Sequence, residues 1–132
     1  MNAFVVVGNV HRFDIVKHFN CSNMVVWKQV SKGKIGDEVY IYIGRPLSRL
    51  VYKCRIVEIN VNADNVEYVS TYEGKRKPSY MKLELMEELP AGGLDLVQLL
   101  DHGLKTVQCS TMIDEKLKSY IDEVIKKWNL KR

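Results

Sequence analysis

The stretch Glu38-Val39-Tyr40-Ile41-Tyr42-Ile43 lies between two turn-forming segments and decides the class of fold. Three aliphatic residues alternate in it with two tyrosines, which is the period-two pattern of a β-strand. Segment 32–37 before it holds two glycines and an aspartate, and segment 44–48 after it begins Gly-Arg-Pro, so both are predicted turns. The pattern predicts a strand at 38–43 with one aliphatic face and one tyrosine-bearing face.

Further strands are predicted on both sides of this one, at 3–7, 50–59, 66–72 and 80–86. Helices are predicted at 11–19, with Asn9 as a cap, at 94–100, and along an apolar stripe from Ile113 to Trp128, with Ser110-Thr111 as a cap. The order of strand, helix, clustered strands and helices predicts an α+β fold with a mostly antiparallel, barrel-like sheet. Helices at both ends are expected to cover its edges.

The chain has the length and composition of one globular domain, assigned to residues 1–132. Its net charge of +4 divides into +6 (9 − 3) for residues 1–56 and −2 (11 − 13) for residues 57–132, which favours an anionic partner on one face. No apolar run approaches the roughly 18 residues of a membrane span. The apolar N-terminal stretch also lacks a basic region before it, so we expect a cytoplasmic protein without a membrane partner.

Catalytic and metal-binding motifs give little signal. There is no GxSxG, HExxH, P-loop or GxGxxG sequence. His11 and His18 have only Asp14 and Cys21 nearby as further ligands, and the three cysteines form no CxxC pair. We therefore expect a binding protein without a metal or another cofactor, and not an enzyme.

An aromatic residue beside polar ones suggests nucleic-acid binding. Trp27 is followed directly by Lys28 and Gln29, so its ring is suited to stack on a base while the polar groups read the base edge. Tyr42, Tyr72 and Tyr80 are candidates for further walls. The alternative interpretation makes Trp27 a core residue. The candidate phosphate contacts are the basic residues Arg45, Arg49, Lys53, Arg55, Lys75, Arg76, Lys77 and Lys82.

The run from Trp27 to Tyr42 resembles the EVE domain of the PUA-like superfamily. Members have a first strand, a short helix, a Trp, and then a Gly-Asp that opens a strand of the type apolar-x-apolar-Tyr, here Gly36-Asp37. Residues 52–58 are similar to the long central strand of the family, and 104–108 with the closing helix are similar to the C-terminal part of some members.

The resemblance implies a PUA-like pseudo-barrel of five or six strands with flanking helices. It also implies a pocket for a flipped, modified base, as in the related YTH domains. That pocket would use Gly8 and Asn9, then Trp27 and Lys28, with Tyr42, Tyr72 or Tyr80 as second wall. The chain departs from the pattern at Lys28, where YTH domains have Ser, and at Cys109-Ser110, where many members show Gly-Pro.

The sequence thus predicts a non-catalytic module that recognises a modified, methylated base in DNA or RNA by base flipping. Arg45, Arg49 and the basic loop Lys75–Lys77 would hold phosphates, and Trp27→Ala would abolish base-specific binding while the fold survives. One alternative is a small ASCH-like hydrolase of modified nucleosides, with Lys28 and either Glu38 or Glu58. Another is a protein-interaction domain of a defence system, which would meet a protein effector through the exposed face of the last helix.

Overall fold

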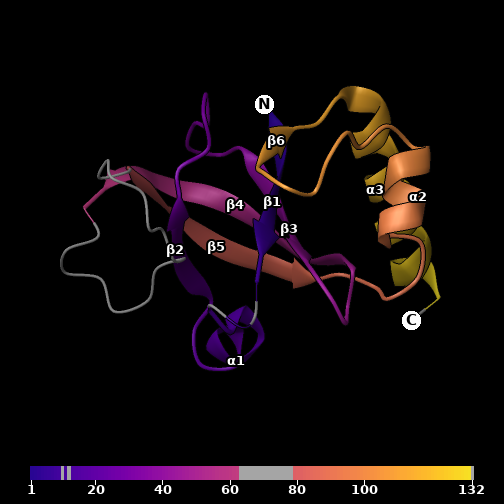
Figure 1. The fold of residues 1–132 in the computed structure, drawn as a ribbon, viewed down its shortest axis with the longest axis horizontal. Helices are drawn as coiled ribbons and strands as arrows, with labels where there is room; N and C mark the ends of the chain where they lie inside the picture. Colours follow the sequence, from indigo (N-terminus) through magenta and orange to yellow (C-terminus); the bar gives the residue numbers. More distant parts are fainter. Residues whose placement is uncertain (10, 12, 63–78, 132) are drawn as a thin grey trace.

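The computed structural model describes residues 1–9, 11, 13–62 and 79–131 (Figure 1). The predicted strand at 66–72 and the basic loop 73–78 lie outside them. The elements in chain order are β1 (Ala3–Gly8), α1 (Ile15–Phe19), β2 (Met24–Lys28), β3 (Glu38–Ile43), β4 (Arg49–Val61), β5 (Tyr80–Glu88), α2 (Leu96–Asp101), β6 (Thr111–Met112) and α3 (Glu115–Leu130).

The strands form one open six-stranded sheet in the order β2-β5-β4-β3-β1-β6. β1 and β3 pair in parallel, from Ala3 opposite Glu38 to Gly8 opposite Ile43, and every other pair is antiparallel. β3 has the predicted bounds 38–43, and the turn at 44–48 joins it to β4 as an antiparallel neighbour. The predicted α+β class with a mostly antiparallel sheet is confirmed.

The alternation in β3 separates the core into two clusters on opposite faces of the sheet. Val39, Ile41 and Ile43 belong to a cluster that α1 contributes to, which we call the α1-side core. Tyr40 and Tyr42 belong to a second cluster with residues of α2 and α3, the α3-side core. All six β3 residues are buried, so the tyrosine-bearing face is covered as fully as the aliphatic one.

The first helix is shorter than predicted. α1 begins at Ile15 because the Asp14 carboxylate accepts a hydrogen bond from the Lys17 backbone N–H at 3.0 Å, as an N-cap does. The predicted cap, Asn9, instead accepts from the His11 backbone N–H at 2.9 Å, within a local turn. The prediction of a helix from residue 11 with Asn9 as cap was therefore wrong.

The last helix is likewise capped by a different residue. Asp114 accepts a hydrogen bond from the Leu117 backbone N–H at 2.9 Å, so α3 begins at Glu115. Thr111, which was predicted as part of the cap, belongs instead to β6, which pairs with Phe4 and Val5 of β1. In both helices the residue that caps is the aspartate directly before the first turn, whose short side chain reaches the open N–H groups.

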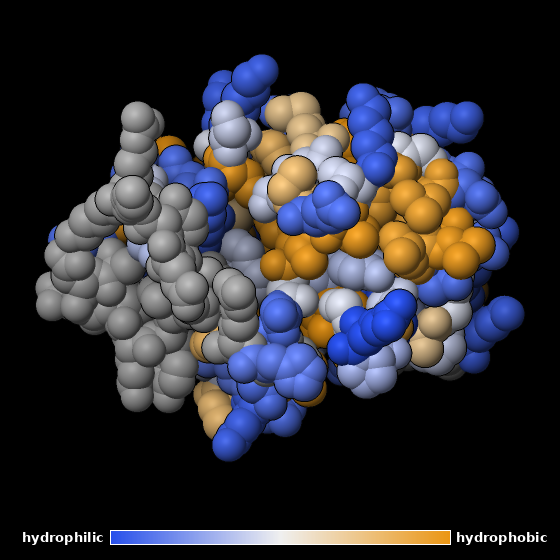
Figure 2. All heavy atoms as spheres, in the orientation of Figure 1, coloured by the Kyte–Doolittle hydropathy of each residue, from blue (hydrophilic) through white to orange (hydrophobic). Residues whose placement is uncertain are grey.

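The exposed apolar surface is concentrated near the C-terminal helices. Figure 2 shows hydrophobic side chains gathered over the region where Figure 1 draws α2. α2 exposes Val97 and Leu100, and α3 exposes Trp128 and Leu130 near its end. Within the described ranges, no helix is long and apolar enough to cross a membrane.

Candidate functional site

The structure brings together two of the predicted site residues, Gly8 and Trp27, which are nineteen positions apart in the sequence. Gly8 ends β1, and a β-carbon placed on it would lie 3.3 Å from Cη2 of the Trp27 indole. The ring is only 5% exposed and packs in the α1-side core near Ile41. Any larger residue at position 8 would press on the indole, so the two positions form one unit.

Asn9 and Lys28 follow these two residues and are both exposed. The Asn9 backbone carbonyl accepts from the Phe13 N–H at 3.0 Å, and its side-chain oxygen accepts from the His11 N–H. These bonds fix the Asn9 side chain and leave its amide N–H₂ as the donor group. The end of β1 therefore presents an exposed amide next to the Gly8–Trp27 contact, whereas Lys28 extends from the face of β2 opposite to the indole.

Neither of the two described tyrosines that were predicted as the second wall, Tyr42 and Tyr80, lies on the indole side of its strand. Tyr42 packs in the α3-side core, on the other face of the sheet. Tyr80 begins β5 opposite Lys28, whereas Trp27 is opposite Met81. Because successive side chains of a strand point to opposite faces, Tyr80 lies on the Lys28 side, away from the indole. Tyr72 lies outside the described residues.

Five of the predicted phosphate contacts lie among the described residues. Lys53 and Arg55 are paired with Glu38 and Glu84, and Lys82 is half-buried on β5. Arg45 is exposed in the turn after β3. The Arg49 guanidinium instead donates through Nη1 to the backbone carbonyls of Leu50, Leu89 and Pro90 at 3.2, 3.3 and 3.4 Å. Arg49 thus ties the start of β4 to the chain after β5. Three further predicted contacts, Lys75, Arg76 and Lys77, lie outside the described residues.

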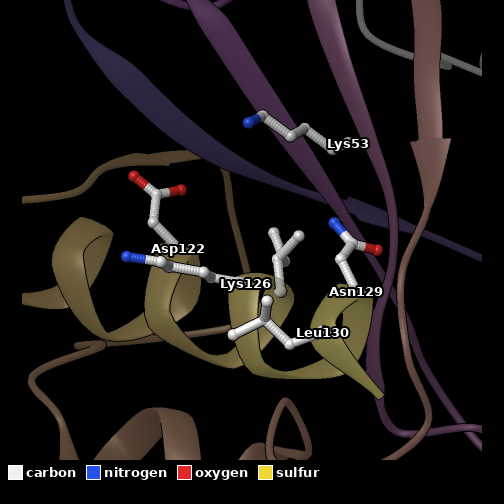
Figure 3. A pocket seen from close by; sticks show the side chains of 6 residues that line it. Lys53, Asp122, Lys126, Asn129 and Leu130 are labelled. Atoms are coloured by element: carbon white, nitrogen blue, oxygen red, sulfur yellow. The ribbon is translucent and has the colours of Figure 1, made fainter. Parts of the chain in front are cut away.

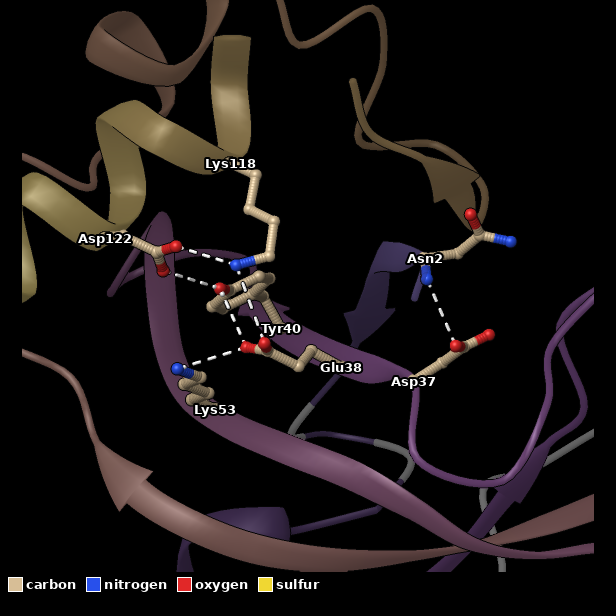
Figure 4. Close-up of polar contacts among 7 residues, drawn as sticks. All are labelled: Asn2, Asp37, Glu38, Tyr40, Lys53, Lys118 and Asp122. Carbon is tan, nitrogen blue, oxygen red and sulfur yellow. Dashed lines mark hydrogen bonds and ion pairs between the residues drawn. The ribbon is translucent and has the colours of Figure 1, made fainter. Parts of the chain in front are cut away.

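A polar cluster that the sequence analysis did not find joins β3 and β4 to α3 (Figure 4). We call it the α3 polar cluster; it consists of Glu38, Tyr40, Lys53, Lys118 and Asp122. Lys53 Nζ lies 3.0 Å and Lys118 Nζ 3.5 Å from the Glu38 carboxylate, and Lys118 also lies 2.7 Å from Asp122. The Tyr40 hydroxyl lies between the carboxylates, 3.3 Å from Glu38 and 3.1 Å from Asp122.

Burial and charge act together on the titration of this cluster. The pKa of Tyr40 is raised well above its ordinary value by burial and by the negative charges of Asp122 and Glu38. Burial alone lowers the pKa of Lys118, but the hydrogen bond to Asp122 and the two carboxylate charges outweigh it, so the pKa is raised. Tyr40 therefore stays a neutral donor and Lys118 stays charged, and the two amines balance the two carboxylates.

The sequence contained one local signal of this cluster. Lys118 and Asp122 are spaced i,i+4 on the last helix, which places them on one face. Glu38 and Tyr40 are spaced i,i+2 on the strand, which also places them on one face. What joins the two pairs is the docking of α3 on the sheet, a contact between residues 82 positions apart for Tyr40 and Asp122.

An open hollow of about 360 Å³ adjoins the cluster between β4 and the second half of α3 (Figure 3). Lys53 borders it from the sheet. Its α3 side is formed by Asp122, Ile125, Lys126, Asn129 and Leu130. Lys53 and Asp122 belong to both the hollow and the α3 polar cluster. The ion pairs and hydrogen bonds of the cluster therefore hold two of the side chains that line the hollow.

The residues of the alternative hydrolase prediction come from three different strands. Lys28 is on β2, at one edge of the sheet, and both β5 and β4 lie between it and Glu38 on β3. Glu38 is held by Lys53 and Lys118 in the α3 polar cluster. Glu58 is exposed on β4, one strand removed from β2. In the part of the chain that the structure describes, no three His, Cys, Asp or Glu side chains converge as metal ligands.

Comparison with known proteins finds likeness in structure and none in sequence. No family model and no curated protein matches the sequence. A tyrosine-to-phenylalanine variant of ASCH from Zymomonas mobilis superposes with a TM-score of 0.66 at 8% identity, over 94% of this chain and 99% of that one. The unmodified ASCH gives 0.63 at 10% identity, over 92% and 94%. Atu2648 from Agrobacterium tumefaciens gives 0.65 at 11% identity, over 96% and 92%.

The fold is PUA-like. This confirms the predicted pseudo-barrel architecture with flanking helices. The likeness is to the fold of ASCH structures, and it does not single out the EVE family that the sequence resembles.

Proposed function

We propose that this chain is a nucleic-acid-binding module that recognises a modified, methylated base in DNA or RNA, flipped out of the stack at the end of β1. The observation that carries the proposal is the contact between Gly8 and Trp27, which lies next to the exposed Asn9. The PUA-like fold supports it, since the resemblance on which the pocket was predicted lies within that superfamily.

Each residue has a separate task in the proposed pocket. Gly8 has no side chain, so the Trp27 indole can pack directly against the end of β1. The Asn9 amide donates to the edge of the base, and Lys28 with Arg45 and the basic loop Lys75–Lys77 neutralises phosphates. Trp27 supplies the stacking face. Because the indole is 5% exposed, the base reaches it only when the side chains covering it move aside.

Charge supports an anionic partner. The +6 balance of residues 1–56 lies on the segment that contains β1, β2 and the turn after β3. A positive surface of this kind attracts phosphates whatever the sequence of the nucleic acid. Added salt should therefore weaken the attraction of phosphates to the charged surface more than it weakens base recognition by the pocket.

The test compares the two tryptophans of the chain. Purified protein is titrated with short single- and double-stranded DNA and RNA, with and without methylated or hydroxymethylated bases, at two salt concentrations. Trp27→Leu removes the ring but keeps an apolar side chain in the core, and Trp128→Leu is the matched control. Stacking is worth roughly 1–3 kcal/mol per base, so Trp27→Leu is expected to weaken binding of the modified base by about 5- to 150-fold.

Circular dichroism establishes that each variant folds. If Trp27→Leu does not fold, Asn9→Ala serves instead, because Asn9 is exposed and its loss should reduce discrimination between modified and unmodified bases. Binding that ignores the modification and collapses with salt in the unmodified protein would reduce the proposal to a basic surface. Turnover of acylated or alkylated nucleosides would contradict the binding role in favour of an enzyme.

A further inference from the structure

The hollow beside α3 combines apolar side chains with a carboxylate, an amine and an amide on a single helix face. Residues 122, 125, 126 and 129 are spaced i, i+3, i+4 and i+7, which is one stripe along a helix. Ile125 is 7% exposed, and Leu130 at 77% extends the apolar surface toward solvent. Lys53 closes the opposite side from β4 (Figure 3).

The charges around the hollow leave a positive surplus at one end. The Asp122 carboxylate is already bound by Tyr40 and Lys118, and Glu38 is bound by Lys53 and Lys118. These two carboxylates and two amines sum to zero, so Lys126 contributes +1 to the wall. Glu87 is opposite Lys53 in the β4–β5 register but does not line the hollow. The surplus charge lies on α3.

We propose that this hollow is a second binding site, separate from the end of β1, for a small molecule with one anionic group on a flat apolar body, of the class of a nucleoside monophosphate. The anionic group binds Lys126 and the remaining N–H donors of Lys53. The flat body rests on Ile125 and Leu130, and the Asn129 amide pairs with its polar edge. The volume of about 360 Å³ lies within the range of small-ligand pockets.

The α3 polar cluster gives the site its rigidity. Lys53 is 17% exposed and is held by Glu38, so its amine is already in place and loses little freedom when an anion binds. Asp122 is held at both oxygens, which keeps its charge neutralised beside the ligand. An anion that enters the hollow therefore contacts the fixed amine of Lys53, and the charge of the fixed Asp122 carboxylate beside it is already neutralised.

The test is titration of the full chain with a nucleoside 5′-monophosphate by calorimetry, with the parent nucleoside and inorganic phosphate as separate ligands. Saturable binding of the monophosphate is expected, with the nucleoside and the phosphate each about tenfold weaker or more, because each lacks half of the contacts. Lys126→Ala and Asn129→Ala are each expected to weaken binding about five- to tenfold. Lys127→Ala, an exposed neighbour outside the lining, is the matched control and should leave the affinity unchanged.

Three outcomes would overturn the site. Equal binding of inorganic phosphate would show an unspecific anion contact, and equal losses in Lys126→Ala and Lys127→Ala would show general surface charge. Binding of a short oligonucleotide through Lys126 in preference to the mononucleotide would make the hollow part of a nucleic-acid surface. The proposal does not rest on base recognition at β1, since Trp27→Leu is expected to leave mononucleotide binding intact.

Discussion

The two faces of the sheet are stabilised in different ways. The α1-side core is built from aliphatic and aromatic side chains, with Trp27 against Gly8 and Ile41 nearby. The α3-side core has a similar apolar centre, but it ends in the α3 polar cluster, where Tyr40 joins the strand to Asp122 of the helix. β3 contributes to both because its side chains alternate.

The difference shows that one strand can pack on both faces of a sheet while a different kind of interaction dominates on each face. On the α1 side, stability comes from area removed from water, which is non-directional. On the α3 side, hydrogen bonds and ion pairs fix the position of one helix, which is directional and gives little net energy. We therefore expect substitutions to cost most on the α1 side and to shift helix position most on the α3 side.

The largest effect is expected from Trp27→Ala. The variant removes a large buried ring from the α1-side core and should lower the free energy of unfolding by about 3–5 kcal/mol. Urea denaturation measures it, with Trp128→Ala as the control, since Trp128 is 42% exposed. A loss below about 1 kcal/mol for Trp27→Ala would mean that the indole is not a core residue in solution.

Alkaline pH tests the α1-side core next. Burial raises the pKa of the Cys54 thiol in the α1-side core from 9.0 to about 12. The folded state thus keeps the proton, and the unfolded state loses it first. The protonated thiol contributes fully to the free energy of unfolding below pH 9, and this contribution is lost as the pH rises toward 12. The loss amounts to about 2–3 kcal/mol at pH 11.

Unfolding at a series of pH values from 7 to 11 measures this loss. Cys54→Ala should show a shallower decline than the unmodified chain, because the titrating thiol is gone. Cys21→Ala is the matched control, since Cys21 is exposed and should leave the decline unchanged. Identical declines in all three proteins would place the alkaline sensitivity elsewhere, for example in Tyr52, whose pKa is raised to about 12 by burial and by Glu88.

Tyr40→Phe tests the directional side of the comparison. It removes the hydroxyl between Glu38 and Asp122 and should cost about 1–2 kcal/mol of unfolding free energy. Tyr42→Phe, on the same strand and face, is the control and should cost less. If the two substitutions cost the same, the cluster adds nothing beyond the packing of the rings.

Asp122→Asn should have the smallest effect. The Asp122 side chain is 42% exposed, so its ion pair with Lys118 is screened by water, and the amide can still accept a hydrogen bond from Tyr40. We expect a change below about 1 kcal/mol at low salt and a smaller one at high salt. A loss as large as that of Tyr40→Phe at both salt concentrations would show that this pair is effectively buried.

Much of the fold was predictable because local sequence patterns specify the positions of most of its strands and helices. The bounds of β3 followed from alternation between two turns, and the strands at 3–7, 50–59 and 80–86 were found within a few residues. The caps were less predictable, because several polar residues near each helix were able to cap it, and only the backbone geometry chose Asp14 and Asp114. β6 was missed because two residues carry no periodic signal.

The sequence by itself determined β1, β3, β4 and β5, the alternation of β3 and the apolar stripe of the last helix, because each depends on residues a few positions apart. Only the tertiary structure decided that Gly8 meets Trp27, that the indole is covered, and that Tyr42 faces the other core. The same holds for the α3 polar cluster, in which Tyr40 and Asp122 are 82 positions apart and meet because α3 docks on the tyrosine-bearing face of β3. Contacts of that range follow from chain topology, which local patterns do not encode.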